Sequence, residues 1–109
     1  MKVSDAYLPD KIIEAAKLDG WWQDPKLGWW HPVKGQLSIG FREAGLPEYS
    51  TDFQPIMTLI QKQDDATLTR ICLHLTKAQN NVARCFDWLK SQPHQLLDGL
   101  LVARGIYEA

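Results

Sequence analysis

Four of the five tryptophans of this chain fall within eleven residues, in the segment G-W-W-Q-D-P-K-L-G-W-W at positions 20–30. The segment contains two Gly-Trp-Trp triplets, and such a density of large rings limits how the chain can fold. Neighbouring side chains of an extended segment point to opposite sides, so only one tryptophan of each pair can readily face a core. We therefore expect the other tryptophan of each pair to be partly exposed.

The residues between the two tryptophan pairs, D-P-K-L-G at 24–28, have the composition of a turn. Proline fixes φ at its position, and glycine accepts a positive φ. The pairs Trp21-Trp22 and Trp29-Trp30 are then expected to face each other as the arms of a bent or hairpin-like loop. Two interpretations stay open: the tryptophans form the wall of a small core, or they also form a recognition surface.

Hydrophobic periodicity predicts further elements in the first part of the chain. Residues 9–20 predict a short amphipathic helix, with Pro9 in its first turn and Gly20 as a left-handed cap. Alternating apolar residues at 36–41 predict a short strand. A second helix is predicted from Phe53 to Ile60, after three candidate N-caps. A cap at Thr51 would make Gln54 part of a capping box.

The second part of the chain predicts a hairpin followed by a helix. Ile71, Leu73 and Leu75 alternate with polar residues, which is typical of a half-buried strand at 69–76. A turn at Asn80-Asn81 would pair this strand with 82–89 and set Leu75 opposite Phe86 and Leu73 opposite Trp88, although a helix at 82–90 stays open. The segment 93–105 predicts a helix with a leucine stripe. Within that helix, Gly99 indicates either tight packing or a weak helix.

Composition limits the class of protein. The 109 residues, 45% of them hydrophobic, suffice for one core, so we expect a single domain over 1–109. Twelve basic residues against 13 acidic ones give a weak field, so we expect no long-range attraction of nucleic acid or of an anionic membrane surface. No apolar run is long enough for a signal peptide or a membrane span, which predicts a soluble, intracellular protein.

The stretch L-P-E-Y-S-T-D at 46–52, the helix leading into tryptophan at 12–22, and the strand pair leading into an Ala/Leu-rich final helix resemble the phage ABA sandwich domain. This resemblance implies an α+β fold, a single-domain α/β sandwich in which about three helices cover a small antiparallel sheet of three to four strands. It also implies a bacteriophage or prophage origin, and it transfers no catalytic residues. The second Trp-Trp pair and Gly99 depart from the family pattern.

The reactive side chains do not form a recognisable catalytic or metal motif. Cys72-Leu73-His74 and the lone Cys85 lack the ligand spacing of structural zinc, and a Cys72–His74 pair lacks a third group to orient the base. Phosphate-binding glycine loops and nucleophile-elbow motifs are also missing from the sequence. We therefore expect a protein that is not an enzyme and that uses no metal or cofactor.

Most cations are spread along the chain as on a solvated surface, yet Arg42, Arg70 and Arg84 could meet beside the tryptophans.

The leading hypothesis is a phage accessory protein in the host cytoplasm that binds a host protein, such as a component of antiviral defence. Self-pairing into a homodimer stays open. The alternative is a module that sequesters a nucleotide between tryptophan rings, with arginine as the phosphate partner. The candidate binding residues are Trp21, Trp22, Trp29, Trp30, His31, Arg42 and Arg84.

Overall fold

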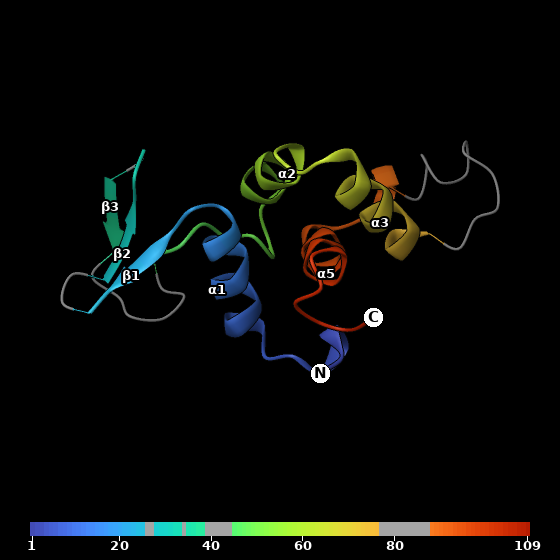
Figure 1. Ribbon diagram of the computed structural model, residues 1–109, viewed down its shortest axis with the longest axis horizontal. Helices are drawn as coiled ribbons and strands as arrows, with labels where there is room; N and C mark the ends of the chain where they lie inside the picture. The colour runs from blue at the N-terminus through green and yellow to red at the C-terminus, as the bar shows by residue number, and fades with distance from the viewer. Residues whose placement is uncertain (26–27, 34, 39–44, 77–87) are drawn as a thin grey trace.

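The computed structural model describes residues 1–25, 28–33, 35–38, 45–76 and 88–109, and Figure 1 shows the course of the chain. A short 3-10 helix, η1, precedes four longer helices, and residues 88–90 are also helical. The bounds are η1 Val3–Asp5, α1 Leu8–Leu18, α2 Phe53–Gln61, α3 Asp65–Leu75 and α5 Pro93–Ala103. Three short strands, β1 Trp22–Asp24, β2 Gly28–His31 and β3 Gly35–Ser38, lie between α1 and α2 in the sequence.

Helix α1 ends in a glycine cap, as its sequence predicts. Gly20 has a φ of 99°, and its N–H donates to the carbonyl of Lys17 at 3.2 Å. The N–H of Trp21 donates to the carbonyl of Ala16 at 2.9 Å. These two bonds form a Schellman motif, which turns the chain back onto the end of the helix. Trp21 is consequently packed into the core beside the buried face of α1, which includes Ala16.

The two tryptophan pairs form the arms of a hairpin, which confirms that prediction. Strands β1, β2 and β3 are antiparallel and lie in that order in one sheet. Trp22 is the partner of Trp30 across β1 and β2, and Gly28 begins β2 with a φ of 88°. Strand β3 agrees with the first part of the strand predicted at 36–41, and residues 39–41 lie outside the described residues.

Helix α2 begins after Asp52, whose carboxylate accepts a hydrogen bond from the N–H of Gln54 at 3.1 Å. The N-cap is therefore Asp52, one of the three candidates, and the capping box built on Thr51 is wrong. Asp52 is the N-cap because its side chain reaches an N–H group of the first turn that has no partner within the helix. The predicted apolar face is confirmed at Ile56 and Ile60, which are buried, whereas Phe53 is exposed.

The strand predicted at 69–76 is wrong, because residues 69–75 belong to helix α3 and Thr76 is its C-cap. The carboxylate of Asp64 caps this helix by accepting from the N–H of Thr67 at 2.8 Å. Ile71 is fully buried, whereas Leu73, which the alternating pattern placed on the same buried face, is 53% exposed. The predicted pairing of Leu73 and Leu75 across a hairpin is therefore also wrong. Residues 77–87 lie outside the described residues.

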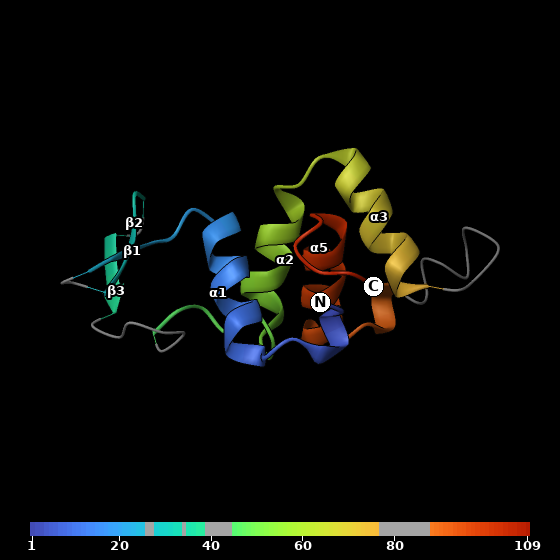
Figure 2. The same cartoon turned by 60° about the horizontal axis from the view of Figure 1, so that its bottom comes forward.

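Helix α5 lies at the centre of the helical part and packs against α1, α2 and α3 (Figures 1 and 2). Its predicted leucine stripe is confirmed, because Leu96, Leu97, Leu100 and Leu101 are all buried. At Gly99 the backbone approaches α3 closely: a Cβ atom there would lie 3.3 Å from Cγ2 of Ile71. Tight packing, rather than a weak helix, therefore explains this glycine.

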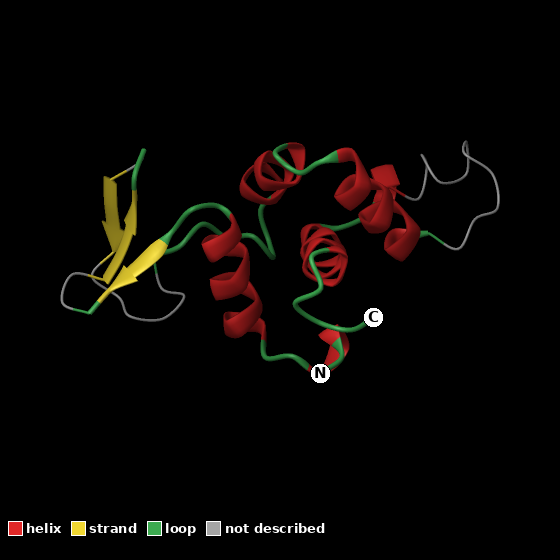
Figure 3. Cartoon of the chain, in the orientation of Figure 1, coloured by secondary structure: helices red, strands yellow, loops and turns green. Residues whose placement is uncertain are grey.

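The predicted α+β class is confirmed, but the described residues do not show helices layered over a sheet. Figures 1 and 3 show the sheet at one end of the molecule, beyond α1, while the other helices gather around α5. The reason is that residues 69–75, expected to extend the sheet, pack as a helix against α5. Helix-on-helix contacts around α5 therefore form most of the core.

We predict that Gly99→Val destabilises the fold by about 1–3 kcal/mol, because a branched side chain must displace Ile71 from a well-packed contact. Urea unfolding followed by circular dichroism measures this loss. The matched control is Ala66→Val on the exposed side of α3, which should lose only the helix-propensity difference of about 0.5 kcal/mol. Equal losses in the two variants would contradict the close approach of α3 and α5.

Candidate functional site

The hairpin of β1 and β2 has one buried and one exposed side, and each tryptophan pair is divided between them. Trp21 and Trp29 are 2% and 1% exposed, whereas Trp22 and Trp30 are 49% and 37% exposed. The alternation of side chains along an extended segment predicts this division. The tryptophans therefore lie both in the core and at the surface, which confirms that one tryptophan of each pair is partly exposed.

His31 fixes the buried side of the hairpin to the end of α1. Its Nδ1 accepts a hydrogen bond from the N–H of Val33 at 3.1 Å, so Nε2 must be the protonated nitrogen. Nε2 donates to the carbonyl of Asp19 at 2.8 Å. The ring of Trp21 meets the imidazole edge to face, with centroids 4.8 Å apart. His31, a predicted binding residue, is thus a buried structural residue here.

Asp19 connects three segments through its side chain and lies at the C-cap of α1. One carboxylate oxygen accepts from the hydroxyl of Tyr49 at 2.7 Å, and the other accepts from Nζ of Lys62 at 2.8 Å. A carboxylate at a helix C-terminus faces the negative end of the helix dipole. The two partners offset that repulsion and the desolvation of the charge, so this cluster stabilises the junction of α1, α2 and the sheet.

Tyr49 acts as a hydrogen-bond donor to Asp19. Burial raises the pKa of its hydroxyl above the ordinary tyrosine value, and the hydrogen bond to Asp19 and the negative charge of that carboxylate raise it further. The hydroxyl therefore keeps its proton at neutral pH. A phenol in this state serves neither as a base nor as a nucleophile, and its role is to satisfy the buried carboxylate.

The exposed side of the hairpin carries Trp22 and Trp30, which we call the Trp22–Trp30 surface. The two residues are direct partners across β1 and β2, so their side chains lie next to each other on one face. Within the described parts of the chain, neither indole has a hydrogen bond or a ring contact. Two large apolar rings are thus available to another molecule.

Of the three arginines predicted beside these rings, only Arg70 is among the described residues. Arg42 and Arg84 lie outside the described residues. Arg70 belongs to α3, which lies on the far side of α5 from the sheet (Figure 1), so its predicted position beside the tryptophans is wrong. The error follows from the strand predicted at 69–76, which would have carried Arg70 into the sheet.

The same correction separates Cys72 from His74. Residues two apart on a helix point to different sides, so the two do not share a face as they would on a strand. Cys85 lies outside the described residues. Among the residues that the structure does describe, no three His, Cys, Asp or Glu side chains are grouped so that they could hold a metal ion.

The cluster around Asp19 and a pocket lined by Arg70 and Arg104 were not predicted from the sequence. One signal for the cluster was available: an aspartate directly before the glycine cap of a helix needs partners, because it opposes the helix dipole. The identity of those partners, Tyr49 and Lys62, depends on the tertiary arrangement. The pocket forms only when 65–75 is a helix, whereas the alternating pattern of 69–76 predicts a strand.

Comparisons with protein-family models, with curated proteins and with solved structures found no match to this chain.

We predict that Tyr49→Phe lowers the free energy of unfolding by about 1–3 kcal/mol, since it leaves the buried carboxylate of Asp19 without one of its donors. Urea unfolding at neutral pH measures the loss. Tyr7→Phe is the control, because Tyr7 is 62% exposed, and this variant should unfold as the wild type does. A loss no larger than that of the control would show that the hydrogen bond contributes nothing.

The raised pKa of Tyr49 also predicts how stability depends on alkaline pH. Above about pH 10, a tyrosine of the unfolded chain loses its proton while Tyr49 of the folded chain keeps it, so the folded state binds more protons and stability falls as pH rises. Tyr49→Phe lacks this dependence. The difference in unfolding free energy between the wild type and the variant should therefore shrink above about pH 10, and a constant difference would be the contrary result.

Proposed function

We propose that this protein is a non-enzymatic binding module that engages a protein partner through the Trp22–Trp30 surface. The observation that carries the proposal is the division of each tryptophan pair, with one ring buried as an anchor and its neighbour exposed. Tryptophan is the residue type most often found to dominate the binding energy of protein interfaces. Two such rings next to each other supply a centre for an interface.

The position of the hairpin supports a protein partner over a small molecule. The sheet stands at one end of the molecule (Figures 1 and 2), where another surface can approach it. Among the described residues, the pockets beside α2, between α3 and α5, and beside Ser91 are lined by neither Trp22 nor Trp30. Small ligands are usually enclosed by concave sites, whereas flat apolar surfaces suit proteins.

The buried half of the hairpin supports binding by holding the exposed rings in place. Trp29 packs in the core, and His31 joins β2 to Asp19 at the end of α1. Trp22 and Trp30 therefore extend from backbone that is already fixed. Side chains that are ordered before binding lose less conformational entropy when the complex forms.

The origin of the chain and the kind of partner form a further part of the proposal. They rest on the resemblance of 46–52 and of the first helix and tryptophan pair to the phage ABA sandwich domain. On that basis the chain is a phage or prophage accessory protein in the host cytoplasm, and its partner is a host protein such as a component of antiviral defence. In the described part of the chain, the helices are too short and too polar to span a membrane.

We predict that Trp22→Ala and Trp30→Ala fold normally but bind the partner about 30-fold or more weakly, because truncating a central tryptophan costs about 2 kcal/mol or more. Quantitative capture from the lysate of the host bacterium compares the tagged wild type with each variant. Binding of the captured protein is then measured with purified components. The matched control is Phe53→Ala, which removes a ring of similar exposure on α2.

The outcomes separate the candidate roles of the two rings. A protein retained by the wild type and by Phe53→Ala, and lost by both tryptophan variants, supports the proposal. Capture that does not depend on Trp22 or Trp30 contradicts it. If the wild type self-associates and both variants lose this association, the partner is a second copy of the chain and not a host protein. If a nucleotide quenches the tryptophan fluorescence of the wild type, the ligand is that nucleotide. Unfolding of both variants would show that the rings serve the core.

A further inference from the structure

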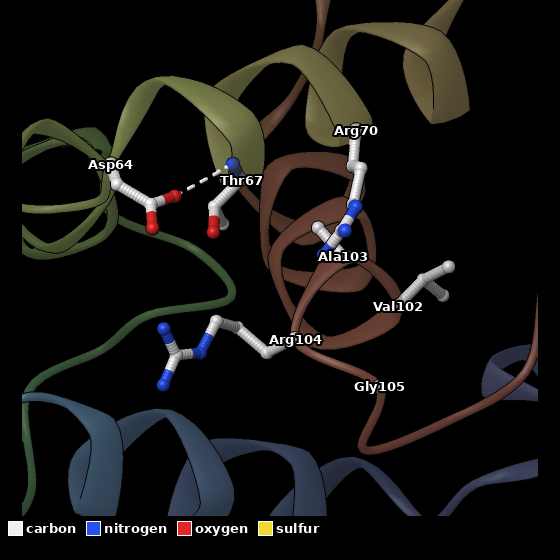
Figure 4. A pocket seen from close by; sticks show the side chains of 7 residues that line it. All are labelled: Asp64, Thr67, Arg70, Val102, Ala103, Arg104 and Gly105. Carbon is white, nitrogen blue, oxygen red and sulfur yellow. Dashed lines mark hydrogen bonds between the residues drawn. The ribbon is translucent and has the colours of Figure 1, made fainter.

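A pocket of about 480 Å³ lies where the N-terminus of α3 meets the C-terminus of α5 (Figure 4). Arg70 of α3, Arg104 at the C-cap of α5, and Asp64 at the N-cap of α3 line it. Val102 and Ala103 add an apolar part to its wall. These side chains come from segments more than 30 residues apart, so the packing of α3 on α5 creates the site.

The two arginines of this pocket form no direct contact with an acidic side chain among the described residues. Within the described residues, neither guanidinium makes a hydrogen bond or an ion pair, although both line the same pocket as Asp64. The carboxylate of Asp64 instead accepts from the N–H of Thr67 at 2.8 Å. Two positive charges and one negative charge leave the pocket with a net positive charge.

The helix end beside the arginines does not supply the missing acceptors. The carbonyls of Leu101 and Val102 accept from the N–H groups of Ile106 and Gly105, each at 3.0 Å. This is a Schellman motif, in which Gly105 has a φ of 75°. The carbonyls of Leu101 and Val102 are thus already engaged. Among the described residues, the N–H donors of both guanidinium groups can therefore bond with water or with a ligand in the pocket.

We propose that Arg70 and Arg104 bind the carboxylate or phosphate group of a small organic anion. A guanidinium presents its N–H donors as a planar fork that matches two oxygens of either group. One negative charge on the ligand neutralises the net charge of the lining. The apolar wall at Val102 and Ala103 can contact the carbon part of the ligand.

Asp64 adds a requirement for the ligand. Hydrogen bonds from the hydroxyl and the N–H of Thr67 lower the pKa of its carboxyl group, and the charges of Arg104 and Arg70 act in the same direction. Asp64 is therefore ionised at neutral pH, and a carboxylate can accept several hydrogen bonds. A ligand that carries a hydroxyl or ammonium donor near its anionic group satisfies both the arginines and Asp64. This inference does not depend on the function proposed for the Trp22–Trp30 surface.

The test is a nuclear magnetic resonance titration of the full chain with sodium phosphate and, separately, with sodium acetate, at constant ionic strength. The backbone amide signals of Thr67 and Gly105 report on the pocket. We expect these signals to shift and saturate with at least one of the anions. Arg70→Gln and Arg104→Gln should each weaken that binding about tenfold, as expected for the loss of a charge-assisted hydrogen bond.

The matched control is Lys90→Gln, which removes the same charge from an exposed residue before the opposite end of α5. This variant should bind as the wild type does. Saturation with phosphate alone or with acetate alone supports the site and identifies the group that it prefers. Shifts that do not saturate with either anion, or an equal weakening by Lys90→Gln, would show that the anions act only as general counterions and would overturn the proposal.

Discussion

The structure of the tryptophan hairpin depends on a buried carboxylate, that of Asp19. Burying a charge is strongly unfavourable unless its oxygens are hydrogen-bonded, and a carboxylate at a helix C-terminus also opposes the helix dipole. Here the hydroxyl of Tyr49 and the ammonium of Lys62 satisfy the two oxygens, and the backbone carbonyl of the same residue accepts from His31. Four segments therefore meet at this residue, and their meeting attaches the sheet to the helices.

The exposure of two tryptophans follows from that attachment together with the glycine cap of α1. The cap turns Trp21 into the core, and the extended backbone of β1 then directs Trp22 to the opposite side. On β2, burial of Trp29 and His31 in the same way leaves Trp30 outside. The register of the hairpin brings Trp22 and Trp30 together. A local rule of backbone geometry thus produces the surface on which the proposed function rests.

Local patterns predicted the first, second and last helices, the hairpin and the division of the tryptophans, because caps, turns and periodicity are determined by neighbouring residues. They failed at 69–76, where Ile71, Leu73 and Leu75 fit one face of a strand and only Ile71 is fully buried in the helix that forms. The helix is favoured by the cap at Asp64 and by the close approach of α3 to α5 at Gly99. The close approach is a tertiary contact, so local sequence patterns do not predict it. Arg70 was misplaced for the same reason.

The three residues of each Gly-Trp-Trp triplet have different roles. The roles that serve the stability of the fold are thus separate from the role in binding that we propose. The glycine supplies a positive φ, at the end of α1 for Gly20 and at the start of β2 for Gly28. The first tryptophan of each triplet is buried in the core, whereas the second is partly exposed. Because Trp21 and Trp29 are the fully buried members of the pairs, substitutions at Trp22 and Trp30 alter the exposed surface and leave the two buried rings unchanged.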